Sequence, residues 1–278
     1  MQVAAIQMTS GPDVAANLAQ ARELLEQAAA RGAKLAALPE NFSFIGLKDG
    51  DKRAVAEADG AGPVQEFLAA TARALKLWIV GGTVPLKAGA DGRVAAASLV
   101  YSSDGERVGR YDKIHLFDVD LPGRSERYRE SAHVAPGSAP VVIDTPVGRL
   151  GLSVCYDVRF PELYRHLSAA GAQLLAVPSA FTSPTGRAHW ETLLRARAIE
   201  NLCYVVAPAQ SGFHPGGRET YGDSMIVDYW GRILQRVPRG RGCALADIDT
   251  AAQASVRESF PALAHRALGA AATPGATR

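Results

Sequence analysis

The sequence has 278 residues, of which 47% are hydrophobic and 21% charged, so it is long and apolar enough to bury a sizeable core. Its 30 basic and 28 acidic side chains leave a formal charge of +2, which argues against a nucleic-acid or anionic-membrane binding protein. No apolar run approaches the roughly 20 residues that a membrane-spanning helix needs.

Three cysteines, Cys155, Cys203 and Cys243, cannot all pair within one chain, which indicates reduced thiols. The opening segment "MQVAAIQMTS" has neither the basic start nor the long apolar stretch of a secretory signal. We therefore expect a soluble cytoplasmic protein. Cys203 and Cys243 each begin an apolar stretch and are interpreted as packing residues.

The first half of the chain alternates short apolar strands with helices. Apolar residues near helical spacing predict a helix over 14–30, and Pro63 suits the first turn of a second helix over 63–76. The expected strands are 3–7, 34–39, a buried strand over 77–86, and two strands within 95–116 around a Ser-Asp-Gly turn.

The second half repeats this rhythm. We expect a strand pair over 139–155, helices over 161–170 and 189–202, and further strands over 172–181, 203–210, 223–237 and 243–249. The alternation indicates one α/β domain over 1–266, with either a mixed sheet or two packed sheets. The small residues of 267–278 predict a loose C-terminal tail.

Three polar residues follow predicted strands: Glu40, Lys113 and Cys155. The carboxyl ends of strands in an α/β sheet converge on one rim, where a carboxylate, an ammonium and a thiol would supply a base, an oxyanion stabiliser and a nucleophile. Taken singly, each residue has a structural explanation. A glutamate after proline is commonly a solvated turn residue, a lysine a surface charge, and a lone cysteine a packing residue.

The surroundings of these residues resemble a known family. "LPENF" (38–42), "YDKIHLFDVD" (111–120) and "CYDVRFPELYR" (155–165) are similar to the three signature segments of the nitrilase superfamily of carbon–nitrogen hydrolases. Their order and spacing match, and the resemblance extends over about residues 3–265.

This resemblance implies a four-layer αββα sandwich with internal pseudo-twofold symmetry, in subunits that usually form homodimers. It places the catalytic roles on Glu40, Lys113 and Cys155, and a second glutamate on Glu130. It implies no metal and no organic cofactor.

The implied chemistry is amide hydrolysis through a thioester. Glu40 would accept the Cys155 proton as the sulfur attacks the carbonyl, while Lys113 and the backbone N–H of Tyr156 hold the oxyanion. Glu40 would then protonate the leaving amine and activate water. Glu130 would orient Lys113 or the substrate amide.

Segments 178–212 and 221–231 resemble the Nit branch of the superfamily, which hydrolyses deaminated glutathione to 2-oxoglutarate and Cys-Gly. A sister branch, ω-amidase, removes ammonia from 2-oxoglutaramate. Both substrates are small amides with an α-keto acid head, so a cationic anchor is expected. Arg159 is the candidate, with Phe181 and Thr182 as pocket wall. An arginine at a helix start can also simply cap the helix or form a surface ion pair.

The chain departs from the branch pattern at Ala95 and Ala96, where a Tyr-Asn pair is usual, and at Asp223, where histidine is common. We expect neither departure to touch the catalytic set. A catalytically idle scaffold of the same fold and a nitrilase acting on C≡N remain as alternatives.

Other polar residues are assigned structural roles. His189 lacks a second metal ligand at helical spacing, and the arginines Arg195 and Arg197 are expected to form salt bridges. Whether the segment 213–222 moves over the pocket is left open by the sequence.

Overall fold

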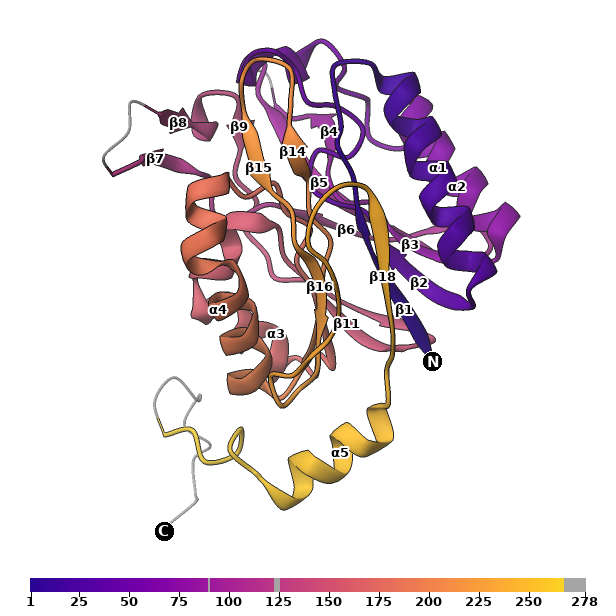
Figure 1. Ribbon diagram of the computed structural model, residues 1–278, viewed down its shortest axis with the longest axis vertical. Helices are drawn as coiled ribbons and strands as arrows, with labels where there is room; N and C mark the ends of the chain where they lie inside the picture. Colours follow the sequence, from indigo (N-terminus) through magenta and orange to yellow (C-terminus); the bar gives the residue numbers. More distant parts are fainter. Residues whose placement is uncertain (90, 123–125, 268–278) are drawn as a thin grey trace.

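The structure is a computed structural model that describes residues 1–89, 91–122 and 126–267 (Figure 1). It contains two packed β-sheets, so the alternative of a single mixed sheet is wrong. The tail predicted over 267–278 lies, beyond its first residue, outside the described residues.

The first sheet has the strand order β18-β1-β2-β3-β5-β4, with β6 and β9 also pairing with β5. Strands β1, β2 and β3 are parallel and are joined through two helices. The elements are β1 (Gln2–Gln7), α1 (Val14–Ala30), β2 (Ala33–Ala37), α2 (Pro63–Leu75), β3 (Trp78–Val80), β4 (Val84–Lys87), β5 (Val94–Tyr101), β6 (Arg107–Asp112), β9 (Val134–Ala135) and β18 (Gly242–Asp247).

The second sheet has the order β10-β11-β12-β13-β16-β17. Its central strands are again parallel, with a helix in each connection. The elements are β10 (Val142–Thr145), β11 (Gly148–Leu152), α3 (Pro161–Ala169), β12 (Leu174–Ala176), α4 (Ser183–Asn201), β13 (Tyr204–Ala207), β16 (Ser224–Val227) and β17 (Ile233–Val237).

Smaller elements complete the chain. Two ribbons and three 3₁₀ helices lie in the connections, and one helix follows the last strand: η1 (Asp49–Arg53), β7 (Asp118–Asp120), β8 (Arg127–Arg129), η2 (Glu130–Ala132), η3 (Cys155–Arg159), β14 (Ser211–Phe213), β15 (Glu219–Tyr221) and α5 (Thr250–Ser259). Helix α5 and the two ribbons are absent from the predictions made from the sequence.

Alternation along the strands produces four layers. In β1, Val3 and Ala5 belong to the core between the two sheets, while Ala4 and Ile6 belong to the core under α1 and α2. Helices α3 and α4 cover the outer face of the second sheet (Figure 1). Each half has an antiparallel strand, three parallel strands joined through helices, and another antiparallel strand. The expected αββα sandwich with internal pseudo-twofold symmetry is therefore confirmed.

Several predicted boundaries are wrong; the strand expected over 172–181, for example, is limited to β12 (Leu174–Ala176). The buried strand expected over 77–86 is divided into β3 and β4, because the chain turns at Gly82, whose φ is +46°. A Cβ on Gly82 would lie 2.0 Å from the Pro39 carbonyl oxygen. The helix expected from residue 189 starts at Ser183, with Pro184 in its first turn, where proline is well tolerated.

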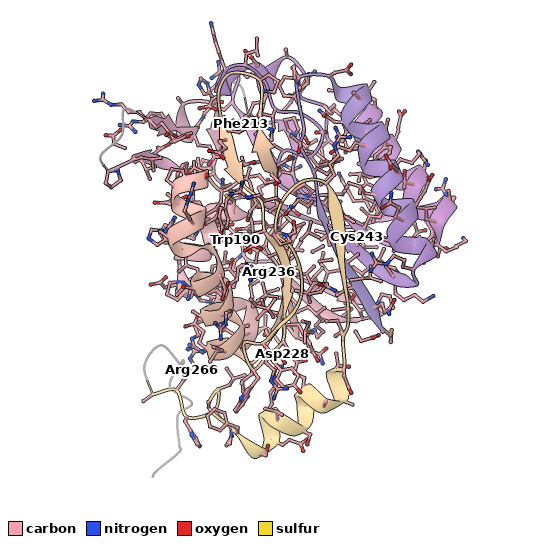
Figure 2. The ribbon with its side chains drawn as sticks, in the orientation of Figure 1. Trp190, Phe213, Asp228, Arg236, Cys243 and Arg266 are labelled. Atoms are coloured by element: carbon pink, nitrogen blue, oxygen red, sulfur yellow. The ribbon has the colours of Figure 1, made fainter. Side chains whose placement is uncertain are left out.

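The three cysteines are free thiols. Cys203 is buried, and Cys243 is partly buried on β18 (Figure 2). Within residues 1–89, 91–122 and 126–267, no helix is long and apolar enough to cross a bilayer.

Candidate active site

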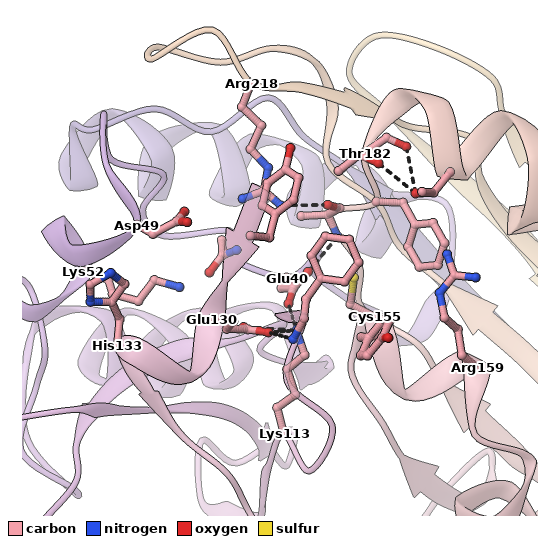
Figure 3. Close-up of a pocket in the computed structure, with 17 residues that line it drawn as sticks. Glu40, Asp49, Lys52, Lys113, Glu130, His133, Cys155, Arg159, Thr182 and Arg218 are labelled. Atoms are coloured by element: carbon pink, nitrogen blue, oxygen red, sulfur yellow. Dashed lines mark hydrogen bonds and ion pairs between the residues drawn. The ribbon is translucent and has the colours of Figure 1, made fainter. Parts of the chain in front are cut away.

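Glu40, Lys113 and Cys155 line one pocket (Figure 3). Glu40 follows β2, Lys113 directly follows β6, and Cys155 follows β11. Each of the three residues is buried, with no more than 8% of its surface exposed. The expectation that these strand ends converge is confirmed.

Cys155 lies where the chain turns from β11 into η3. Its φ is +50°, a left-handed conformation that costs a non-glycine residue on the order of 1–3 kcal/mol and persists only where the surrounding structure imposes it. The Cys155 N–H donates to the Pro178 carbonyl at 2.9 Å and fixes the turn. Tyr156, the next residue, stands in the first turn of η3, where N–H groups have no acceptor inside the helix.

The charged groups form a connected set. The Lys113 Nζ donates to Glu40 Oε1 at 2.8 Å and to Glu130 Oε2 at 2.8 Å. Glu40 Oε2 accepts the Ala180 N–H at 2.9 Å, and Glu130 Oε2 accepts the Phe117 N–H at 2.7 Å. Each carboxylate is therefore held both by the Lys113 ammonium and by a backbone N–H, and these two hydrogen bonds together fix its position.

Burial and charge shift the pKa values in this set. Burial alone would lower the Lys113 pKa, but the Glu130 and Glu40 carboxylates outweigh it and raise that pKa well above its usual value. Burial would raise the Glu130 pKa, but Lys113 and then Lys52 hold it below its usual value. For Cys155, burial and the Glu40 carboxylate together raise the pKa, so the resting side chain is a thiol.

Asp157 connects two segments of the site and was not found from the sequence. It is fully buried and accepts the Tyr111 hydroxyl at 2.7 Å, the Val154 N–H at 2.8 Å and the His115 N–H at 3.0 Å. Tyr111 and His115 flank Lys113, whereas Val154 and Asp157 flank Cys155. This one carboxylate therefore fixes the ammonium relative to the thiol.

Arg159, Phe181 and Thr182 all lie on the pocket wall, as expected. The Arg159 guanidinium lies 5.3 Å from the Phe181 ring centre, and its Nη1 is 3.2 Å from His189 Nδ1. Thr182 is buried, and its hydroxyl lies 2.8 Å from that of Thr185. Thr185 also lines the pocket and was missed, because the helix that carries it was predicted to start later.

The pocket is also lined by residues that no sequence pattern singled out. They come from the segments after β2 and β6, from η1, from β8 and the end of η2, and from the β14–β15 loop: Asn41, Asp49, Lys52, Phe117, Tyr128, His133 and Arg218. Asn41 and Phe117 lie inside the segments 38–42 and 111–120, whereas the other five residues belong to no segment identified from the sequence. All seven meet because distant connections fold over the same strand ends.

The departures from the branch pattern have structural partners. Asp223 is buried and forms a salt bridge with Arg236. Ala95 and Ala96 are buried on β5, and the Ala96 carbonyl accepts the Lys113 N–H at 3.1 Å. This contact is made by the Ala96 backbone and needs no particular side chain, so the expectation that neither departure affects the catalytic set stays a prediction.

The structural roles expected for the arginines are confirmed. Arg195 pairs with Glu191 at 3.4 Å, and Arg197 pairs with Glu200 at 2.8 Å. His189 is exposed and contacts Arg159. Across the part of the chain that the structure describes, no group of three or more His, Cys, Asp or Glu is arranged to hold a metal ion.

An αββα sandwich with a buried carboxylate, ammonium and thiol at its strand ends has the architecture of a thiol-dependent hydrolase. The chain belongs to the carbon-nitrogen hydrolase family, whose model matches residues 2–258. It is a hydrolase of carbon–nitrogen bonds, acting on an amide.

Individual relatives are similar over nearly the whole chain. A protein of Synechocystis named deaminated glutathione amidase is 46% identical over 266 residues, which are 95% of this chain and 97% of that protein. The crystal structure of the C. elegans NitFhit protein superimposes with a TM-score of 0.89 at 42% identity, covering 96% of this chain and 65% of that one. The match thus spans about two thirds of the worm protein.

A third relative is an amidase from Nesterenkonia, 28% identical, with a TM-score of 0.78 and coverage of 94% of this chain and 98% of that one. In the structure of its glutamate-to-glutamine variant, acrylamide has undergone Michael addition at the active site cysteine.

Proposed function

We propose that this protein hydrolyses the amide bond of deaminated glutathione, releasing 2-oxoglutarate and Cys-Gly. The observation that carries the proposal is the buried set of Glu40, Lys113, Glu130 and Cys155 in one pocket, with the Arg159 guanidinium on its wall. The name of the Synechocystis relative supports the choice of substrate.

Acylation begins from a neutral thiol. Glu40 takes the Cys155 proton as the sulfur attacks the amide carbonyl, because burial makes a free thiolate costly and the proton must leave during the attack. The oxyanion is stabilised by the Lys113 ammonium and by the Tyr156 N–H at the start of η3. Protonated Glu40 then passes the proton to the amine nitrogen, the C–N bond breaks, and a thioester remains on Cys155.

Deacylation reverses the proton path. Glu40 takes a proton from a water molecule, whose oxygen attacks the thioester carbonyl. Collapse of the second oxyanion expels the sulfur, which regains its proton from Glu40, and the acid leaves. Glu130 holds Lys113 through both halves, since the ammonium donates to both of its oxygens.

The acyl side of the substrate is an α-keto acid, and its carboxylate pairs with Arg159. The guanidinium is positioned by its contact with the Phe181 ring and by His189, so less side-chain freedom is lost on binding. Phe181 and Thr182 form the wall beside it.

A side-by-side rate comparison on deaminated glutathione and 2-oxoglutaramate tests this proposal, with Cys155→Ala as the blank. We expect a higher kcat/KM on deaminated glutathione. A preference for 2-oxoglutaramate would instead assign the protein to the ω-amidase branch, and no turnover of either would favour an idle scaffold of the same fold.

We further propose that the protein works as a homo-oligomer, at least a homodimer, in a reducing, cytoplasmic compartment. The free thiols of its three cysteines support the compartment. Ile199, Trp230 and Phe260, each about half exposed, support the contact between subunits. Light scattering tests the assembly: a monomer at micromolar concentration would contradict it.

A further inference from the structure

The pocket contains cations on two sides of its thiol. Figure 3 shows Arg159 and Lys52 on opposite sides of the group formed by Glu40, Lys113 and Cys155. Arg159 is already assigned to the α-keto acid head. The second side, with Lys52 and Arg218, has no role in the chemistry described above.

Lys52 has an uncommitted charge. It belongs to η1 and is partly buried, and among the described residues its ammonium has no hydrogen bond or ion pair. Its charge nevertheless reaches into the site, because it helps to lower the pKa of Glu130. A partly desolvated ammonium without a partner is a favourable position for an anion.

Arg218 is held in place and yet incompletely satisfied. Its Nη2 donates to the Ala180 carbonyl at 3.1 Å, and its guanidinium lies 5.6 Å from the Tyr128 ring centre. Its Nε is buried and has no hydrogen-bond partner among the described residues. Buried N–H donors nearly always have an acceptor, so this atom calls for one.

The space beside these two cations is large enough for an extended ligand. A second cavity of about 320 Å³ adjoins the pocket, and Lys52, Tyr128 and Arg218 line both. A two-residue leaving group spans about 7 Å when extended, and a carboxylate at its far end would extend from the thiol toward this cavity.

We propose that Lys52 and Arg218 form a second anion subsite, which binds the terminal carboxylate of a peptide-like leaving amine. This inference rests on the proposed function and deepens it: the substrate is recognised by an anion at each end, with the scissile amide between them. Ammonia, the leaving group of a primary amide, would make no use of this subsite.

The test compares deaminated glutathione with its C-terminal carboxamide, which lacks only the leaving-group charge. Both substrates share the acyl chemistry, so the ratio of their kcat/KM values reports the subsite alone. We expect a ratio of about ten or more in the wild type, as for one charge-assisted contact. The ratio should fall several-fold in Lys52→Met and in Arg218→Met.

The ratio of kcat/KM values is needed because Lys52 and Arg218 also influence the catalytic residues that act on both substrates. Lys52 affects Glu130, and Arg218 contacts the carbonyl of Ala180, whose N–H holds Glu40. Their effects on the common steps cancel in the ratio. Lys34→Met is the matched control, since it removes a lysine charge from an exposed position on β2 and should leave the ratio unchanged.

Equal rates on the acid and the carboxamide in the wild type would overturn the subsite while leaving the proposed function intact. A ratio of kcat/KM values that neither Lys52→Met nor Arg218→Met changes would overturn the subsite as well. If the wild type cleaves 2-oxoglutaramate but neither larger substrate, the proposed function fails, and calorimetry with Cys-Gly then decides the subsite. Binding of Cys-Gly that is weaker in Lys52→Met than in the wild type would support the subsite, and absence of Cys-Gly binding to the wild type would overturn it.

Discussion

Cys155 is stored as a thiol beside Glu40, the carboxylate that receives its proton in the proposed mechanism. Burial and the Glu40 charge raise the pKa of Cys155 above the ordinary thiol value of 9.0. At pH 9.0 an ordinary thiol would be half ionised, whereas the Cys155 thiol stays protonated. We therefore expect no difference in ultraviolet thiolate absorbance between wild type and Cys155→Ser at pH 9.0. A clear thiolate signal from Cys155 at that pH would show that the nucleophile is pre-ionised and needs no base.

Glu40→Gln separates binding from proton transfer. The amide keeps one acceptor oxygen, for Lys113 or for the Ala180 N–H, but it cannot take the thiol proton. Turnover should fall by about 10²–10⁴ while calorimetric binding of substrate persists. Rapid appearance of an acyl adduct on Cys155 in this variant, seen by intact mass, would contradict the role of Glu40 as base.

Glu130 gives a pH-dependent contribution to stability. Its folded pKa lies below the ordinary 4.5, so its ion pair with Lys113 stabilises the protein above that pH and is lost as the pH falls through the folded value. Glu130→Gln should lower the free energy of unfolding by about 1–3 kcal/mol near neutral pH, because Lys113 keeps Glu40 as a partner.

Denaturant unfolding at several pH values checks this prediction. The difference between wild type and Glu130→Gln should be constant near neutral pH and narrow below pH 4.5. Glu23→Gln, at an exposed position on α1, is the control and should change little at any pH. A difference that widens on acidification would contradict the direction of the pKa shift.

At the scale of elements, the turn between β3 and β4 supports the segment that carries Glu40. Gly82 has a φ of +46°, and a Cβ there would lie 2.0 Å from the Pro39 carbonyl oxygen. Gly82→Ala should therefore destabilise the protein by about 1–3 kcal/mol or more and displace Glu40. Thermal unfolding and kcat measure the two effects.

Gly92→Ala is the matched control, because Gly92 has a φ of +73° and open space around its Cβ position. It isolates the cost of a left-handed alanine from the cost of the steric clash. Equal losses of stability and activity in the two variants would show that the contact with Pro39 does not matter.

Sequence patterns located the elements wherever apolar periodicity was long or a strand was fully buried. Helix α1 was predicted with its observed ends, and β5 and β6 were found around their turn. The β14–β15 ribbon was missed because its strands are short and its register depends on tertiary contacts, such as the buried His214 that lies 2.8 Å from the Ser10 carbonyl oxygen.

At the scale of the whole molecule, the site also divides into residues that could be predicted from the sequence and residues that could not. Glu40, Lys113 and Cys155 could be predicted because each follows a strand and sits within a recognisable segment. Lys52 and Arg218 could not, since a single charged residue in a connection gives no periodic signal. Asp157 lies inside the recognised segment 155–165, but the pattern does not show that its carboxylate bonds to both Tyr111 and the Val154 N–H. Their positions follow only from the packing of the two halves.

The central claim is that one thiol at the junction of the two halves carries the reaction, and the turnover of Cys155→Ala on deaminated glutathione tests it most directly. The substitution removes a small buried atom, so circular dichroism should show an intact fold. We predict a loss of at least about 10³-fold in kcat/KM. Turnover close to that of the wild type in a folded Cys155→Ala protein would contradict the account.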